Sequence, residues 1–334
     1  EEAATIALLM RKALETPGRT AALVTRDRGL ARRTAAALGR WNIAIDDSAG
    51  RPLSHTRAGS FLCLLAEAAD EKFAPVPLLA LLKHPLAAME NAAAFRRHAR
   101  DLDLALRGPR PDAGLSGVAA RLKGKPELAA WFSRVAEFFA PFADLLAAAE
   151  IPLQETLEAH VKAAEALAGE ELWLGTDGEA AKTFVDALRE AAAGIPAIEA
   201  RSYAPLFAGL AGEVPVRPAY GSHPRLAILG PLEARMQRFD LTVLGGLNEG
   251  SWPAAAPADP WFSRPMRRTL GLEQPERAIG LSAHDFASLA AAPEVVLTRA
   301  AKAEGAPAVA SRWLQRLVQL TKGLGLFEKL KPAA

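Results

Sequence analysis

Cysteine is nearly absent from this chain of 334 residues, in which Cys63 is the single example. A disulfide framework needs cysteines in pairs, and a cysteine-ligated zinc or iron–sulfur site needs several, so the sequence excludes both from this chain. Cys63 lies in the apolar run 61–65, which favours a small core residue over a reactive thiol. This cysteine usage is typical of a reducing compartment, and we expect a cytoplasmic protein.

Long apolar segments and an excess of one charge are missing as well. No stretch of about 18 apolar residues is free of charge or proline, and there is no signal peptide, so we expect no membrane partner. The 40 basic and 38 acidic residues give a net charge of +2, which does not indicate nucleic acid. Binding of that kind would depend on local arginine clusters, such as those at 26–33 and 264–268, for which solvated helix faces are the alternative interpretation.

The familiar catalytic motifs are also absent. The chain has no Gly-x-x-x-x-Gly-Lys-Ser/Thr phosphate loop, no Gly-x-Gly-x-x-Gly, no His-Glu-x-x-His and no Gly-x-Ser-x-Gly. The six histidines are scattered, and the acidic pair at 46–47 stands beside Gly50, where turn formation explains it better than metal binding. We therefore predict no catalytic residue and no metal site.

The composition is that of a globular protein, with 50% hydrophobic and 23% charged residues. Three zones follow one another along the chain. Residues 1–74 alternate helix with strand, residues 75–220 are almost entirely helical, and residues 221–334 return to alternation. The chain begins within a helix and without Met, and we expect it to be an internal piece of a longer protein.

In the first zone, apolar residues at helical spacing predict a helix over 6–14. A buried strand is predicted at 20–25, followed by a helix that Asp27 caps at its N-terminus. A second strand is predicted at 43–45 and a turn at 46–50. Such strand–helix–strand units belong to parallel sheets.

The middle zone shows an amphipathic stripe that predicts the core side of a long helix. Its members are Leu128, Trp131, Phe132, Val135, Phe138, Phe139 and Phe142.

The third zone predicts strands at 226–229, 241–244 and 294–297. A short helix is predicted at 231–236, a helix at 282–291 with Ser282 as its N-cap, and a final helix at 310–320. The simplest fold class is α/β, with one parallel sheet completed by both ends of the chain and interrupted by a large all-helical insertion.

The segment 226–253, LAILGPLEARMQRFDLTVLGGLNEGSWP, carries a recognisable pattern. It resembles the region of superfamily 1 helicases related to UvrD in which a strand leads to a short helix, then to a strand and a turn ending Glu-Gly-x-x-Pro. Active members carry Lys-Gly-Leu-Glu in the short helix, and here the Lys-Gly pair is missing. The combination is similar to the AddB family, helicase-like subunits that partner AddA in bacterial double-strand break repair.

The resemblance implies a partial RecA-like lobe and a set of site residues. It aligns Arg26 and Glu233 with nucleotide-site positions of active relatives, and Arg277 loosely with an arginine that contacts the γ-phosphate; here they would be vestiges. Contacts with single-stranded DNA or a duplex end would involve a second group of residues, in which Trp252 either stacks on a base or packs under its turn. That group comprises Arg51, Arg235, Asn248 and Trp252.

The resemblance also implies partners and cofactors. AddB-type proteins bind DNA, scan it for a recombination signal, support AddA, and are generally not motors. The parent complex uses ATP and Mg²⁺, while its iron–sulfur cluster belongs to a nuclease domain outside this chain, so we expect no cofactor here and no activity from this chain alone. Two alternatives stay open, the second lobe of an active ATP-dependent helicase and a helical protein-interaction module. Oligomeric state, DNA polarity and recognition of the signal are left undetermined by the sequence.

Overall fold

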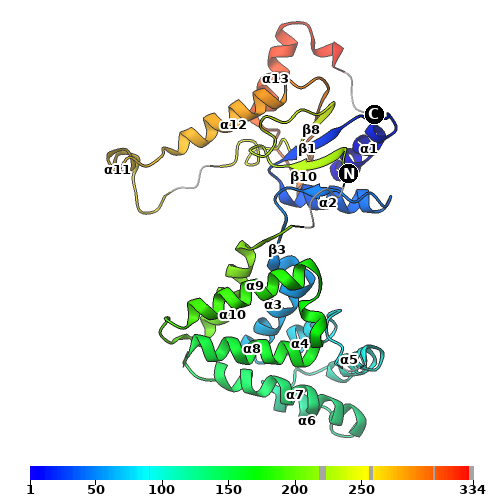
Figure 1. Ribbon diagram of the computed structural model, residues 1–334, viewed down its shortest axis with the longest axis vertical. Helices are drawn as coiled ribbons and strands as arrows, with labels where there is room; N and C mark the ends of the chain where they lie inside the picture. The colour runs from blue at the N-terminus through cyan, green and yellow to red at the C-terminus, as the bar shows by residue number, and fades with distance from the viewer. Residues whose placement is uncertain (90, 218–222, 256–258, 304, 331–334) are drawn as a thin grey trace. The chain divides into compact units, whose positions relative to one another are not determined.

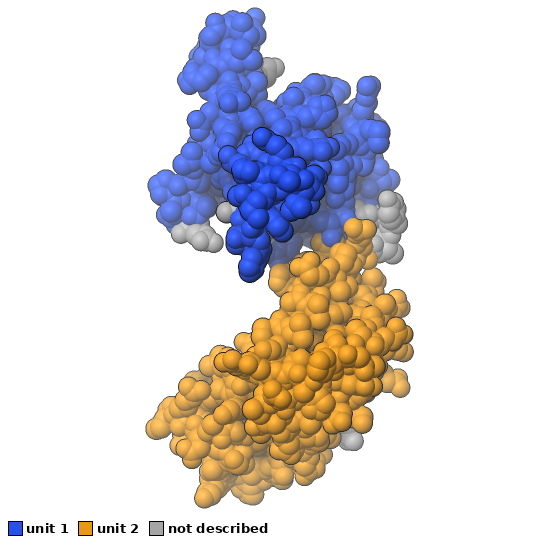
Figure 2. All heavy atoms as spheres, turned by 90° about the vertical axis from the view of Figure 1, so that its left-hand side faces the viewer, with its two compact units in different colours: residues 1–49, 218–334 blue, residues 50–217 orange. Residues whose placement is uncertain are grey.

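The computed structural model describes residues 1–89, 91–217, 223–255, 259–303 and 305–330, apart from the side chain of Asp46. The chain divides into two units, shown in two colours in Figure 2. The α/β unit comprises residues 1–49 and 218–334, and the helical unit comprises residues 50–217. The division therefore precedes the boundary predicted at residue 74, while the boundary predicted at 220 lies outside the described residues.

The α/β unit is built on a five-stranded parallel sheet with the order β2-β7-β1-β8-β9. Its strands are β1 (Ala21–Thr25), β2 (Asp46–Asp47), β7 (Leu226–Leu229), β8 (Leu241–Gly245) and β9 (Val295–Leu297). A small antiparallel hairpin consists of β10 (Lys302–Ala303) and β11 (Ala306–Pro307). Its helices are α1 (Glu2–Leu14), α2 (Arg28–Gly39), α11 (Arg264–Thr269), α12 (Pro275–Leu289), α13 (Arg312–Gly323) and the 3-10 helix η4 (Phe327–Lys329).

The central strand β1 divides the core of this unit into two layers. All five of its residues are buried, and successive side chains point to opposite faces of the sheet. Leu23 packs on one face with Ile6 of α1, in a cluster to which α2 contributes Leu30. Val24 packs on the other face, where Phe286 of α12 and the turn after β8 complete the cluster. The predicted α/β class with a parallel sheet is confirmed.

Local signals explain where several elements begin. The Asp27 side chain accepts a hydrogen bond from the Leu30 amide and caps α2, as predicted. The Ser311 side chain likewise accepts from the Leu314 amide and starts α13. Pro275 occupies the first turn of α12, where its missing amide proton costs nothing. Ser282 is therefore buried in mid-helix, and its prediction as an N-cap is wrong.

Two other predicted elements differ from the structure. Residues 43–45 are irregular, and the strand is instead the pair Asp46–Asp47, which was predicted as a turn. This short strand lies at the edge of the sheet and pairs only with β7, so polar residues are tolerated there. Residues 231–236 form consecutive turns rather than a helix. Leu232 and Met236 are largely exposed in them, so an amphipathic helix would have no apolar face to bury.

The helical unit forms its own core. Its helices are α3 (Arg57–Asp70), α4 (Pro75–Leu82), α5 (Ala92–Leu106), α6 (Leu115–Ala120), α7 (Pro126–Leu146), α8 (Leu153–Ala168), α9 (Gly175–Ala192) and α10 (Tyr203–Glu213), with the 3-10 helices η1 (Leu53–His55), η2 (Gly169–Trp173) and η3 (Ala200–Ser202). Two short antiparallel pairs join β3 (Arg51–Pro52) to β6 (Pro215–Val216) and β4 (Glu150–Ile151) to β5 (Ile198–Glu199). Figure 1 shows these elements in sequence colours.

The stripe predicted on α7 is confirmed, since six of its seven residues are buried and Phe138 is half-buried. The helical unit begins at residue 50 rather than 75 because the long apolar face of α3 packs into the helical core. No helix among the described residues has both the length and the apolar character needed to cross a membrane.

A buried histidine sits in the centre of the helical core. His160 of α8 stacks on Phe142, with ring centroids 5.0 Å apart. Its Nε2 donates to the Leu62 carbonyl oxygen at 3.0 Å, so its Nδ1 accepts from the Tyr203 hydroxyl at 2.9 Å. This arrangement requires the neutral ring, and burial lowers the pKa of His160 from 6.5 to about 4.

This histidine makes the stability of the helical unit depend on pH. Because the folded-state pKa is depressed, the unfolded chain takes up the proton first, and stability present above pH 6.5 is lost as the pH falls towards 4. The loss reaches roughly 3 kcal/mol for a group with this shift. Urea unfolding followed by circular dichroism between pH 7.5 and 4 measures it. His160→Gln should make the profile shallower and leave the part due to His84, whose pKa burial also lowers to about 4, whereas His284→Gln, at an exposed site, should leave the profile unchanged.

Candidate functional site

The carboxyl edge of the sheet is the candidate site. In open parallel sheets, ligands bind beyond the carboxyl ends of the strands, because these ends all meet at one edge. The register places Thr25 opposite Gly245 and Val24 opposite Leu229, so the loops after β1, β7 and β8 meet there. The loop after β9 joins them, since the Thr298 amide donates to the Leu244 carbonyl oxygen.

Arginine follows the central strand at this edge. Arg26 is exposed, and its guanidinium has no hydrogen-bond or ion-pair partner among the described residues. Arg28, two residues further on, forms a two-fold ion pair with Asp47 of the edge strand. Arg26 is therefore the cation of this loop that can meet an incoming anion.

The loop after β7 uses its arginine for a different purpose. Arg235 donates to both carboxylate oxygens of Asp285 on α12, at 2.7 and 3.2 Å. Asp285 is buried, so this pair fastens the loop to the helix. Glu233 is exposed, and its carboxylate folds back over Gly230 at the end of β7. The predicted DNA contact at Arg235 is thus already engaged in a structural bond.

The loop after β8 is fixed by hydrogen bonds to the loop after β9. The Asn248 carboxamide donates to the Ala300 carbonyl oxygen at 2.8 Å and accepts from the Ala300 amide at 3.0 Å. These two bonds tie the loop after β8 to the loop after β9. Gly246 has a φ of +72° and donates its amide proton to the Glu2 carboxylate, which also accepts from Thr298. Asn248 is therefore a structural residue, and its carboxamide has little capacity left for DNA.

Trp252 is fully buried, at 0% exposure. Its ring packs edge-on against Phe286, and its Nε1 donates to the Gly245 carbonyl oxygen at 3.3 Å. The peptide bond to Pro253 is cis. Of the two expectations for Trp252, the structure supports packing under the turn, because a side chain without exposed surface cannot stack on a base in this conformation.

Helix α13 begins at the same edge and is anchored to the turn after β8. Arg312 forms an ion pair with Glu249, and its backbone amide donates to the same carboxylate at 3.2 Å. The hydrogen bond from Arg312 holds the pKa of the Glu249 carboxyl below its ordinary value. The Ser311 amide also donates to the Leu247 carbonyl oxygen, so the start of α13 is fixed at the edge.

A groove of about 610 Å³ runs along α13 from this point. We call it the arginine groove. Arg299, from the loop after β9, donates to the carbonyl oxygens of Ala300 and Ala308, and Arg316 lies over the Trp313 ring at 5.4 Å. No acidic residue is among the described residues that line the groove. The lining consists of Arg299, Ala310, Arg312, Leu314, Gln315, Arg316, Val318 and Gln319.

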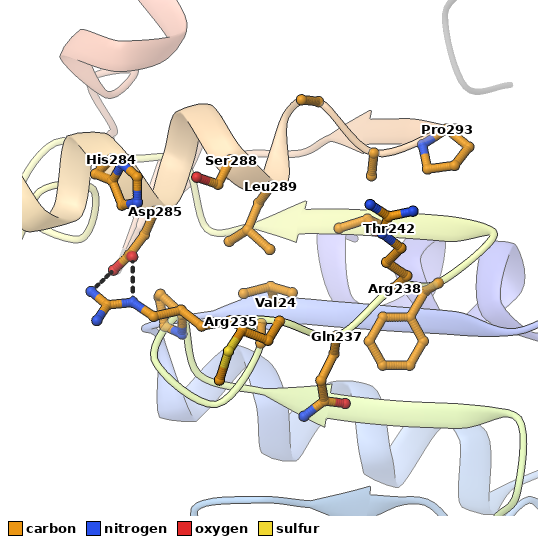
Figure 3. A pocket seen from close by; sticks show the side chains of 16 residues that line it. Val24, Arg235, Gln237, Arg238, Thr242, His284, Asp285, Ser288, Leu289 and Pro293 are labelled. Carbon is orange, nitrogen blue, oxygen red and sulfur yellow. Dashed lines mark hydrogen bonds and ion pairs between the residues drawn. The ribbon is translucent and has the colours of Figure 1, made fainter.

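A second cavity, of about 630 Å³, lies over the face of the sheet rather than its edge (Figure 3). Val24 and Thr242 of the strands form its floor, and Leu289 and His284 of α12 form one wall. The opposite wall is the loop after β7. Because the Arg235–Asp285 pair neutralises one of its two arginines, this cavity is less basic than the arginine groove.

The sequence-predicted residues therefore separate into distinct places. Arg26 and Glu233 share the carboxyl edge. Arg277 lies near the start of α12 in an exposed ion pair with Glu273, 3.0 Å long. Arg51 belongs to β3 of the helical unit. No group of three or more His, Cys, Asp or Glu side chains among the described residues could hold a metal ion.

Three groove arginines were not predicted from the sequence. Arg299 follows a short apolar strand, and Arg312 and Arg316 are four residues apart on α13, so they share one helix side. The spacing in Ser-Arg-Trp-Leu-Gln-Arg was a signal available in the sequence.

Comparison with known proteins adds nothing to these assignments, since neither family models nor curated protein sequences gave a match to this chain.

The buried position of Trp252 predicts a large effect on stability. Trp252→Ala should lower the free energy of unfolding by about 3–5 kcal/mol, because it opens a cavity beneath the carboxyl edge. Trp261, which is 82% exposed, provides the matched control, and Trp261→Ala should change stability little. Urea unfolding at pH 7.5 compares the two. Equal losses in both variants would contradict the packing role.

Proposed function

We propose that this chain is a non-motor, helicase-like DNA-binding region of a double-strand break repair helicase–nuclease. One observation carries the proposal. The two strands of the segment that resembles AddB-type proteins, β7 and β8, flank the central strand, so both of its loops stand at the carboxyl edge beside unpaired Arg26. A parallel sheet with this edge is compatible with a partial RecA-like lobe, and the finer superfamily assignment is part of the proposal.

A motor role is less well supported by the same residues. ATP hydrolysis in helicases requires phosphate and metal ligands from two lobes, and this chain has no phosphate-loop sequence. The loop after β7 lacks the Lys-Gly pair of active relatives, and its Arg235 is engaged by buried Asp285. Arg277 is already engaged in an exposed ion pair with Glu273. The partner AddA-type subunit would supply the motor.

The arginine groove is the part of the edge best suited to a DNA strand. Guanidinium groups bind phosphate oxygens through paired hydrogen bonds, and the groove presents Arg299 and Arg316 without a carboxylate beside them. Gln319 adds an amide donor on the same helix. Because Trp252 and Asn248 face inward, this site offers phosphate contacts rather than base stacking. Binding should therefore be largely independent of sequence and strongly dependent on salt.

Single-stranded DNA binding tests the proposal. Fluorescence anisotropy of a labelled oligothymidylate should show binding at low salt that weakens steeply as salt rises. The double variant R299E/R316E should lower the slope of log K against log salt by about 1.4, the value for two lost phosphate contacts on a single strand.

The matched control is R264E/R277E. It changes the charge equally, at exposed residues ion-paired to Glu276 and Glu273. The control should bind DNA nearly as the parent chain does. Absence of DNA binding by the parent chain at low salt would overturn the proposed function.

Nucleotide hydrolysis separates the proposal from the active-helicase alternative. The purified chain should release no phosphate from ATP above background, with or without single-stranded DNA, because one lobe cannot surround the nucleotide. A phosphate-release assay with Mg²⁺ measures this. A DNA-stimulated rate that disappears in Arg277→Ala would favour the second lobe of a working motor instead.

A further inference from the structure

Basic residues are concentrated in one part of the helical unit. Residues 91–134 contain nine arginine and lysine residues and four aspartate and glutamate residues, an excess of five positive charges. The whole chain carries a net charge of +2. The remainder is therefore slightly acidic, and the near-neutral total conceals a strongly basic segment that begins with helix α5.

Helix α5 has one apolar side and one basic side. Phe95, Ala99, Leu102 and Leu106 are buried at helical spacing. Phe95 meets the Trp131 ring of α7 edge-on at 5.3 Å, and His98 stacks on the same ring at 5.4 Å. These contacts fix the rotation of α5 about its axis. Residues on the opposite side are thereby held outward.

The outward side carries Arg96, Arg97 and Arg100, all exposed. None of the three has a hydrogen-bond or ion-pair partner among the described residues. Arg96 and Arg100 are one helical turn apart and therefore neighbours on the surface. Exposed arginines in this chain are often paired, as Arg201 is with Glu199, whereas these three adjacent guanidinium groups stand beside a single exposed carboxylate, Asp101, and give the surface a net positive charge.

The surface continues towards the end of α5. Helix α5 carries two carboxylates, exposed Asp101 and half-buried Asp103, and Asp103 is already shared by Lys83 at 2.6 Å and Arg107 at 3.5 Å. The hydrogen bond from Lys83 holds the pKa of the Asp103 carboxyl below its ordinary value, so it remains ionised. Arg121 donates to the Arg107 carbonyl oxygen at 3.4 Å and brings a further cation to the same end. The two cations on Asp103 outnumber its single charge.

We propose that this side of α5 is a second nucleic-acid contact, which binds the phosphodiester backbone independently of the arginine groove. Its guanidinium groups match phosphate oxygens and can bind them in pairs. The turn between Arg96 and Arg100 allows contact with neighbouring phosphates of one strand. Each neutralised phosphate releases counterions, which supplies the driving force for binding.

Apolar content favours nucleic acid over an acidic protein as the occupant. Leu104, at 58% exposure, is the large apolar residue of α5 that reaches the surface. The aromatic residues of the region, Phe95, Trp131 and Phe132, are buried. Protein interfaces need an apolar or aromatic core, whereas protein–DNA interfaces are polar and rich in positive charge. Because α5 has no exposed aromatic side chain that could stack on bases, the contact involves the phosphodiester backbone alone.

Charge reversal on α5 tests the inference in the whole chain. The triple variant R96E/R97E/R100E should bind a labelled 20-base-pair duplex at least tenfold more weakly than the parent at low salt. Its slope of log K against log salt should fall by about 2.7, the value for three phosphate contacts on duplex DNA. The matched control is K162E/K182E/R201E, which reverses three exposed cations elsewhere in the helical unit.

The same measurements with single-stranded DNA show whether α5 binds single strands, duplexes or both. Repeating them in the R299E/R316E background separates binding at α5 from binding at the arginine groove. A loss on duplex alone, or on both forms, supports the inference and shows which form is bound. Duplex affinity equal in the α5 variant and the control overturns it, whatever happens at the arginine groove. Binding of labelled polyglutamate as tight as DNA, lost in the same α5 variant, would overturn it in favour of an acidic protein.

Discussion

The central strand β1 is the element on which the α/β unit depends. Its hydrogen-bonded neighbours, β7 and β8, come from about 200 residues further along the chain, and all five of its residues are buried between two layers of side chains. Neither half of the chain can bury this surface alone. The helical unit can be inserted between the strands of this sheet because its own first and last strands pair with each other, with Arg51 opposite Val216. The entry and exit of the chain are therefore adjacent.

Parallel pairing then determines where polar groups gather. All strands end at the same edge, and each loop must satisfy its own backbone there. Asn248 joins the loops after β8 and β9, and the Glu2 carboxylate accepts hydrogen bonds from the Gly246 amide and the Thr298 hydroxyl. The edge is thus made rigid by its own side chains. The groove arginines Arg299 and Arg316 are held by backbone carbonyl oxygens and by the Trp313 ring, so less ordering entropy is lost when an anion binds to them than when it binds to Arg26.

Apolar runs were sufficient to predict the interior from the sequence. The strands around β1 were found because a strand that is buried on both faces of its sheet is mostly apolar. The stripe on α7 was found because a helix that packs on a core has apolar residues along one side. The edge strand Asp46–Asp47 could not be found this way, since a two-residue strand with one neighbour needs no apolar character. The turns at 231–236 were missed for the opposite reason. Their residues favour helix, but Met236 has nothing to pack against.

The site was harder to predict than the fold, because residue type does not reveal which way a side chain faces. Trp252 and Asn248 lie in the segment that resembles helicases, and the side chains of both form hydrogen bonds that stabilise the edge. The resemblance therefore describes the framework of the edge at which we propose that DNA binds. Contact with an anion falls instead to exposed Arg26 and to the arginines of the groove, which stand outside the recognised segment. If the proposed function holds, a chain can keep the framework of such an edge without motor chemistry, since the framework and the cations are separate sets of residues.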